Sequence, residues 1–130
     1  MYEHTTRHIR IVVQPQFLEN QSEPEDSKFV WAYTITLENL SGETVKLLTR
    51  HWIITDGLGR QQEVKGDGVI GEQPTLRPGD SFQYTSGCPL STSSGLMSGS
   101  YGMVDGKGEN FDVVIPAFSL DSPYDRHSVN

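Results

Sequence analysis

The chain has 130 residues, of which 35% are hydrophobic, including 5 Phe, 5 Tyr and 2 Trp. That length fits one domain and that aromatic content fills one core, so we expect a single domain over residues 1–130. The 17 acidic residues outnumber the 10 basic ones and give a formal net charge of −7. Nucleic acid is therefore not an expected partner, because proteins that bind it carry a basic field.

The cellular compartment is predicted from the cysteine content and the N-terminal segment. Cys88 stands alone, which excludes an intrachain disulfide. The first residues lack the apolar segment of a signal peptide, and no apolar run approaches the length of a membrane span. We expect a cytoplasmic protein that makes no membrane contact.

The first half of the chain alternates between apolar and polar residues, as strands do. Residues 7–17 predict one strand, and the polar, acidic stretch 19–27 predicts a solvated loop. Residues 29–37 alternate most clearly, with their larger apolar side chains at odd positions. The strand at 44–55 shifts its apolar phase midway, so we predict a bulge between Leu47 and Thr49.

The second half contains short strands between turns rich in glycine, proline and serine. Pro78 and Gly79 fit the central positions of a type II turn. The strands are predicted at residues 60–65, 80–86, 97–103 and 111–115, with the last ended by Pro116 and a loose polar tail beginning at about residue 119. About seven strands and no substantial helix predict an all-β, two-sheet antiparallel sandwich.

A glycine-rich loop is the sharpest motif. Gly66, Gly68 and Gly71 match the GxGxxG pattern that lets a backbone approach a pyrophosphate in dinucleotide-binding folds. That role requires a following helix, and residues 73–78, with two prolines, cannot form one. Two interpretations stay open: a nest of backbone amides that binds an anion beside Lys65, or a flexible connection between strands.

Catalytic and metal-binding patterns are not found. The four histidines lack the spacing of metal ligands, and Cys88 has no histidine near it in sequence. The serine-rich stretch lacks the GxSxG elbow of hydrolases. We predict no catalytic residue, no metal and no cofactor.

Bulky side chains lie beside glycine-rich backbone in two parts of the chain. Exposed Trp, Tyr and Arg are favoured at protein interfaces. The candidate partner-binding residues are Arg50, His51, Trp52, Val69, Ile70 and Tyr101. We predict a contiguous exposed patch containing some of the four apolar or aromatic members. Burial is the alternative for Trp52, because its strand is apolar on both phases.

Four segments resemble the ApaG family, in order and over nearly the whole chain. They are LTRHWIITDG at 48–57, GDGVIGEQP at 66–74, LRPGD at 76–80 and GSYGM at 99–103. The resemblance implies a stand-alone bacterial member with a fibronectin-III-like sandwich, related to the immunoglobulin-like folds. Members are named for a gene neighbour that encodes a diadenosine tetraphosphate hydrolase, and some are linked to cobalt and magnesium efflux as a phenotype. Related eukaryotic domains, in an F-box protein and a DNA-polymerase-delta-interacting protein, are thought to bind partners.

The resemblance also implies a pyrophosphate site at Gly66, Gly68 and Gly71. Our first hypothesis is nevertheless a non-enzymatic module that binds an unidentified protein, as a monomer or weak homodimer. The alternative is nucleotide or pyrophosphate binding, of the diadenosine tetraphosphate type, at the glycine-rich loop with Lys65. A role in cation homeostasis is the third hypothesis, and for it we expect only weak cation binding by the acidic surface.

Overall fold

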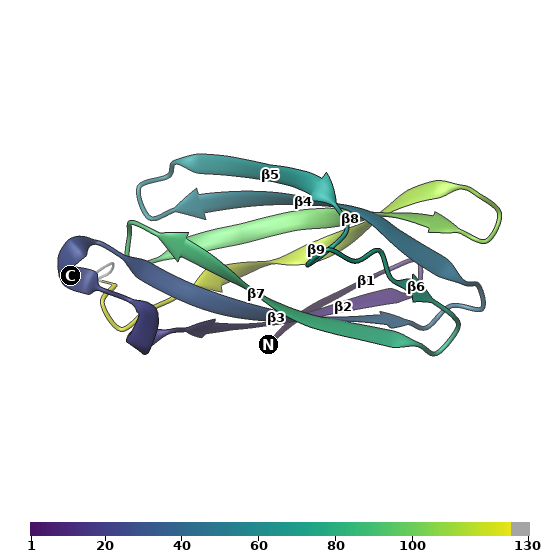
Figure 1. Ribbon diagram of the computed structural model, residues 1–130, viewed down its shortest axis with the longest axis horizontal. Helices are drawn as coiled ribbons and strands as arrows, with labels where there is room; N and C mark the ends of the chain where they lie inside the picture. The colour runs from purple at the N-terminus through teal and green to yellow at the C-terminus, as the bar shows by residue number, and fades with distance from the viewer. Residues whose placement is uncertain (126–130) are drawn as a thin grey trace.

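The computed structural model describes residues 1–125, and within them the chain forms strands joined by turns and two short 3₁₀ segments (Figure 1). The strands are β1 (Tyr2–Thr6), β2 (Ile9–Phe17), β3 (Phe29–Asn39), β4 (Val45–Asp56), β5 (Gln61–Asp67), β6 (Thr75–Leu76), β7 (Ser81–Leu90), β8 (Gly95–Asp105) and β9 (Asn110–Leu120). The 3₁₀ segments are η1 (Glu19–Gln21) and η2 (Pro24–Asp26), inside the predicted polar loop.

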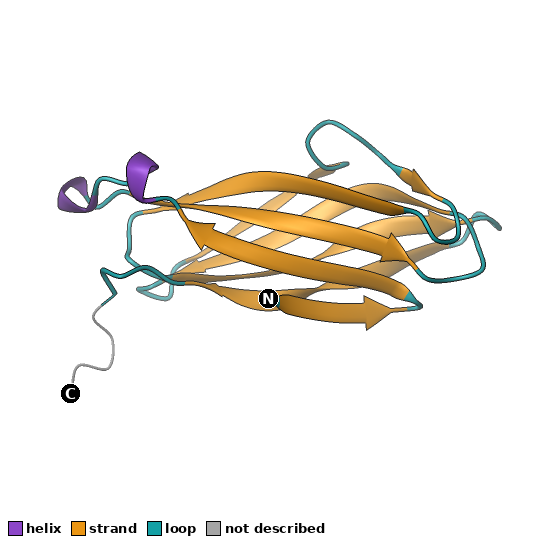
Figure 2. Cartoon of the chain, turned by 90° about the horizontal axis from the view of Figure 1, so that it is seen from below, coloured by secondary structure: helices purple, strands orange, loops and turns teal. Residues whose placement is uncertain are grey.

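The strands build two antiparallel sheets that face each other, which confirms the predicted sandwich. One sheet has the order β1-β2-β3-β7 and the other β5-β4-β8-β9, with β6 paired to β4. Figure 2 shows the two layers, with helical turns only at one end. The sequence predicted about seven strands; the described residues contain nine, and β1 and β6 are the additional ones. No helix within residues 1–125 is long and apolar enough to cross a membrane.

Alternation along β3 places one face of this strand in the core. Phe29, Trp31, Tyr33, Ile35 and Leu37 are all buried, as the odd-numbered apolar positions predicted. Side chains on alternate residues of a strand point to the same face, so these five form a continuous apolar row. At about 25 cal/mol per Å² of buried apolar surface, such a row is a main source of stability.

The predicted bulge in β4 is present. The register of β4 against β8 shifts between Leu47 and Thr49. The extra residue lets Leu47, at an odd position, and Trp52, at an even one, both point into the core.

The first predicted strand, residues 7–17, corresponds closely to β2 (Ile9–Phe17), but its hairpin partner β1 was not predicted. Arg7 and His8 make the turn between β1 and β2, with φ of 48° and 66°. Glycine or asparagine normally occupies such left-handed positions. Because Arg7 and His8 are not residues typical of such a turn, the sequence did not predict it.

The last strand was predicted too short. Residues 111–115 were expected, whereas β9 passes through Pro116 and continues to Leu120. The β8–β9 register shifts so that Met97 faces Phe118 while Gly99 faces Ile115. Pro116 therefore lies in a bulge, where its missing N–H removes no ladder hydrogen bond.

The predicted loose tail has an ordered beginning. Ser119 and Leu120 belong to β9. The ring of Tyr124 lies 6.0 Å from that of Phe17 and 6.1 Å from that of Phe29, measured between centroids. The rest of the predicted tail, residues 126–130, lies outside the described residues.

Candidate functional site

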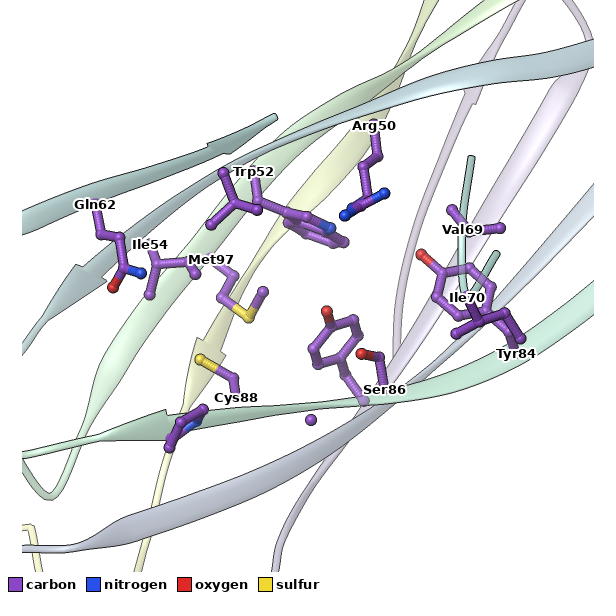
Figure 3. Close-up of a pocket in the computed structure, with 14 residues that line it drawn as sticks. Arg50, Trp52, Ile54, Gln62, Val69, Ile70, Tyr84, Ser86, Cys88 and Met97 are labelled. Carbon is purple, nitrogen blue, oxygen red and sulfur yellow. The ribbon is translucent and has the colours of Figure 1, made fainter. Parts of the chain in front are cut away.

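A cleft of about 450 Å³ lies between the two sheets, on the side where β7 borders one sheet and β5 borders the other (Figure 3). Its volume falls in the range of about 300–1,000 Å³ that is common for binding pockets. The lining comes from five strands and the glycine-rich loop: Tyr33, Arg50, Trp52, Ile54, Gln62, Val64, Val69, Ile70, Tyr84, Ser86, Gly87, Cys88, Pro89 and Met97. The cleft is thus mainly apolar and aromatic, with a few polar groups.

Arg50 supplies the positive charge of the cleft. Its Nη1 donates hydrogen bonds of 2.9 Å to the backbone oxygens of Asp67 and Gly68. The described lining includes no Asp or Glu. A protein with a net charge of −7 therefore presents a positive, half-buried guanidinium inside an apolar cleft, which suits an anionic group.

Two tyrosines line the cleft near Arg50. Burial raises the pKa of both Tyr33 and Tyr84. Hydrogen bonding with Ser86 and with Tyr101, respectively, opposes that rise in part, and the positive charge of Arg50 opposes it to a smaller extent. The Tyr84 hydroxyl lies 2.5 Å from the hydroxyl of Tyr101, a residue of the opposite sheet. Both phenols stay protonated at neutral pH, and they can act as hydrogen-bond donors.

The floor of the cleft is apolar, and its thiol, Cys88, is a poor nucleophile. Trp52 and Met97 are buried there, and Figure 3 shows both facing the space beside Cys88. Burial raises the pKa of the Cys88 thiol to about 11. The thiol is therefore protonated at neutral pH, which makes Cys88 a poor nucleophile.

Backbone amides of the glycine-rich loop are already hydrogen-bonded to carbonyl oxygens of the protein. The Gly68 amide donates to the Leu48 oxygen at 2.8 Å, while Val69 and Glu72 exchange amide-to-carbonyl bonds of 2.8 and 2.9 Å. An anion-binding nest requires amides that point together at an empty site. Three amides of this loop are already paired, so the geometry favours a connection between strands over an anion-binding nest.

Each glycine of the motif has a structural reason. Gly66 faces Arg50 across β5 and β4, and a side chain there would meet the guanidinium. Gly68 and Gly71 have φ of 66° and 81°, a region that L-residues with side chains rarely adopt. The turn itself therefore accounts for the GxGxxG pattern. Lys65 is exposed on β5.

The predicted contiguous patch of exposed apolar or aromatic side chains does not form, because three of its four candidate members are buried. Trp52, Val69 and Tyr101 are 3%, 1% and 0% exposed, and only Ile70, at 56%, reaches the surface. The β4 bulge turns Trp52 inward, where its ring meets Tyr101 edge-on at 6.5 Å between centroids. Val69 is buried against the core and lines the cleft, while Ile70 lies at the rim of the cleft.

The remaining two members of the predicted patch point in different directions. Arg50 lines the cleft, whereas its neighbour His51 lies on the opposite face of β4. There the His51 Nε2 lies 2.6 Å from the Glu63 carboxylate, and this contact lowers the pKa of Glu63. The structure therefore does not bring His51 to the candidate site.

Sequence reasoning missed the contribution of β3 and β7. Tyr33, Tyr84 and Ser86 line the cleft, but each lies in a strand with an ordinary alternating pattern. One available signal was the absence of charge along residues 81–90, which is unusual for a strand at the edge of a sheet. In the part of the chain that the structure describes, no group of three or more His, Cys, Asp or Glu side chains is placed to hold a metal ion.

Comparison with known proteins shows the family. The ApaG domain profile matches residues 19–105. The chain belongs to the ApaG family. The Protein ApaG of Rhodospirillum centenum is 60% identical over 130 residues, covering 100% of both chains. That of Bradyrhizobium sp. is 57% identical over the same length, again covering 100% of both chains.

A solved structure supports the same fold for this ApaG-family chain. The crystal structure of an ApaA protein from Bordetella pertussis matches it with a TM-score of 0.87 and 44% identity, covering 90% of this chain and 95% of that one. These names state no ligand and no reaction. The chemistry of the cleft therefore carries the functional proposal.

Proposed function

We propose that this ApaG-family domain is a non-enzymatic module that binds a protein partner through the cleft between β5 and β7. The observation that carries the proposal is the placement of Arg50 in an apolar, aromatic cleft of about 450 Å³ with the exposed Ile70 at its rim. Arginine and aromatic side chains are enriched where proteins bind one another most strongly.

The polar groups of the cleft favour binding over chemistry. A nucleophile needs a base within hydrogen-bond reach. The described lining contains no histidine and no carboxylate, and burial keeps the Cys88 thiol protonated. Tyr33, Tyr84 and Ser86 instead offer hydroxyls that orient a bound segment. Any link to cobalt or magnesium efflux would then run through the partner.

A matched pair of variants tests the proposal. Ser86→Trp places a large side chain in the cleft, whereas Thr85→Trp places the same side chain on the exposed outer face of β7. Each purified protein is used to capture partners from a soluble extract of cells that carry the gene, and captured proteins are identified by mass spectrometry. We expect one protein to bind the wild type and Thr85→Trp but not Ser86→Trp. Equal capture by all three, or by none, contradicts the proposal.

Binding of a nucleotide or pyrophosphate at Lys65–Gly71 is the competing hypothesis. Titration of the labelled protein with diadenosine tetraphosphate, followed by two-dimensional amide NMR, separates the two. Because the Gly68 and Val69 amides are paired within the loop and its flanking strand, we expect no saturable shift change from Lys65 to Gly71. A saturable change confined to those residues would replace the protein-binding proposal.

A further inference from the structure

Strand β7 is a long sheet edge without charged residues. Among the described strands it pairs only with β3, which leaves one side of Ser81–Leu90 open. No Asp, Glu, Lys or Arg occurs in these ten residues. By contrast, β5, which borders the other sheet on the same side, carries Glu63, Lys65 and Asp67. Proteins normally protect edge strands with charge or proline, and a stretch without either is a template for another strand. Residues 81–88 contain neither, and Pro89 ends this stretch.

The hydrogen bonds at the end of β3 show which groups of β7 face outward. The Asn39 amide donates to Asp80 at 2.9 Å, and the Leu40 amide donates to His8 at 2.9 Å. Odd-numbered residues of β3 therefore bond to even-numbered residues of β7, because the bonding direction alternates along a strand. The amides and carbonyls of Thr85 and Gly87 are left facing the open edge. Pro89, which has no N–H, fits the same odd-numbered set.

We propose that the partner supplies an extended segment that pairs with β7 along residues 84–88. This inference rests on the proposed function and specifies its binding mode, which is strand addition to a sheet edge. Tyr84, Ser86 and Cys88 face the cleft from β7. Side chains of the added strand that lie beside them would point into the same cleft, at every second residue.

The lining indicates what that segment carries. Arg50 favours a carboxylate, and the apolar floor around Trp52 and Met97 favours a large apolar side chain two residues away. A second copy of β7 would not meet this requirement, because residues 81–90 contain no carboxylate. Charge complementarity thus favours a different protein over self-association.

A phage-displayed random peptide library provides the probe. Peptides selected on the full chain are synthesised, and their affinity is measured by calorimetry for the wild type, Gly87→Pro and Gly87→Ala. Gly87→Pro removes an outward-facing amide and leaves the β3 bonds in place. Gly87→Ala keeps the amide, and its Cβ would meet the Trp31 oxygen at an ordinary 3.5 Å. We expect the selected peptides to carry an acidic and an apolar residue two positions apart. Binding to Gly87→Pro should be about tenfold weaker than to the wild type, and Gly87→Ala should lose clearly less affinity than Gly87→Pro.

A second readout needs no variant. Hydrogen exchange of the Thr85 and Gly87 amides in the wild type should slow by about tenfold or more when peptide saturates the protein, since each amide gains a partner. The Ser86 and Cys88 amides, already bonded to β3, should change less.

Several outcomes would overturn the inference. Peptides that bind Gly87→Pro as well as the wild type, or that leave the Thr85 and Gly87 amides unprotected, exclude strand addition. If such peptides still fail to bind Ser86→Trp, the cleft stands as the binding site and only the mode is wrong. Three further results would contradict strand addition to β7: a library that yields no peptide, a dimer formed through β7, or displacement of the peptide by diadenosine tetraphosphate. Capture from cell extract tests the proposed function separately.

Discussion

The guanidinium of Arg50 lies over the backbone of Gly66, its partner across β4 and β5. A methyl group on Gly66 would lie 2.9 Å from Cζ and 2.8 Å from Nη2 of Arg50. The same guanidinium bonds to the carbonyls of Asp67 and Gly68 and lines the cleft. One side chain therefore links the glycine-rich loop to the candidate binding site.

The first prediction concerns Gly66→Ala. Its methyl group displaces Arg50, which loses the bonds to Asp67 and Gly68, so we expect the free energy of unfolding to fall by about 1 kcal/mol. Gly42→Ala is the control, because the space around Gly42 is open; its effect should stay within about 0.5 kcal/mol. Urea denaturation measures both. Equal stabilities would show that Arg50 does not depend on a bare backbone at Gly66.

The two left-handed glycines of the loop should differ in their tolerance of alanine. A Cβ on Gly68 would lie 2.4 Å from the Glu72 backbone oxygen, whereas Gly71 has open space around it. Both substitutions carry the cost of a left-handed L-residue, about 1–2 kcal/mol, and only Gly68→Ala adds a backbone clash. Thermal denaturation should therefore rank Gly68→Ala well below Gly71→Ala. The reverse order would contradict the loop geometry.

A third pair tests the separation of core from surface. Trp52→Ala removes a buried ring and should lower the free energy of unfolding by about 3–5 kcal/mol. Ile70→Ala, at the exposed rim, should change it by about 0.5 kcal/mol or less. Chemical denaturation gives both values, and a small effect for Trp52→Ala would place that ring at the surface after all.

The buried thiol predicts a pH dependence. The Cys88 pKa of about 11 in the folded state exceeds the ordinary value of 9.0. Deprotonation is then easier in the unfolded chain, so stability is lost as pH rises from about 9 to 11, by up to about 3 kcal/mol. Cys88→Ala should show a shallower decline over this window in denaturation curves recorded at each pH. Parallel declines for the two proteins would show that the thiol is not responsible.

Local pattern predicted much of the fold. The alternation of residues 29–37 predicted the buried face of β3, and the phase shift at Leu47–Thr49 predicted the bulge in β4. The β1 hairpin was missed because Arg7 and His8 turn the chain in a conformation that their side chains do not favour. Pro116 was misjudged because a bulge depends on the partner strand as well as on the proline.

The candidate site was harder to predict because sheet pairing assembles it. Tyr33, Arg50 and Ser86 come from three strands in two sheets and meet only in the folded chain. Composition showed that Trp52 was bulky and beside glycine-rich backbone, but burial depended on the β4 bulge. The glycine motif was visible, whereas the pairing of its amides was not.

Photo-crosslinking in living cells tests the central claim most directly. Ile70, at the rim of the cleft, is replaced by p-benzoylphenylalanine, and Leu96, an exposed apolar residue of β8 outside the cleft lining, serves as the matched control position. We expect irradiation to join one defined protein to the probe at position 70 and not to the probe at position 96, and Ser86→Trp to abolish the adduct. Adducts that are the same at both positions, or that persist in Ser86→Trp, would contradict a protein-binding cleft between β5 and β7.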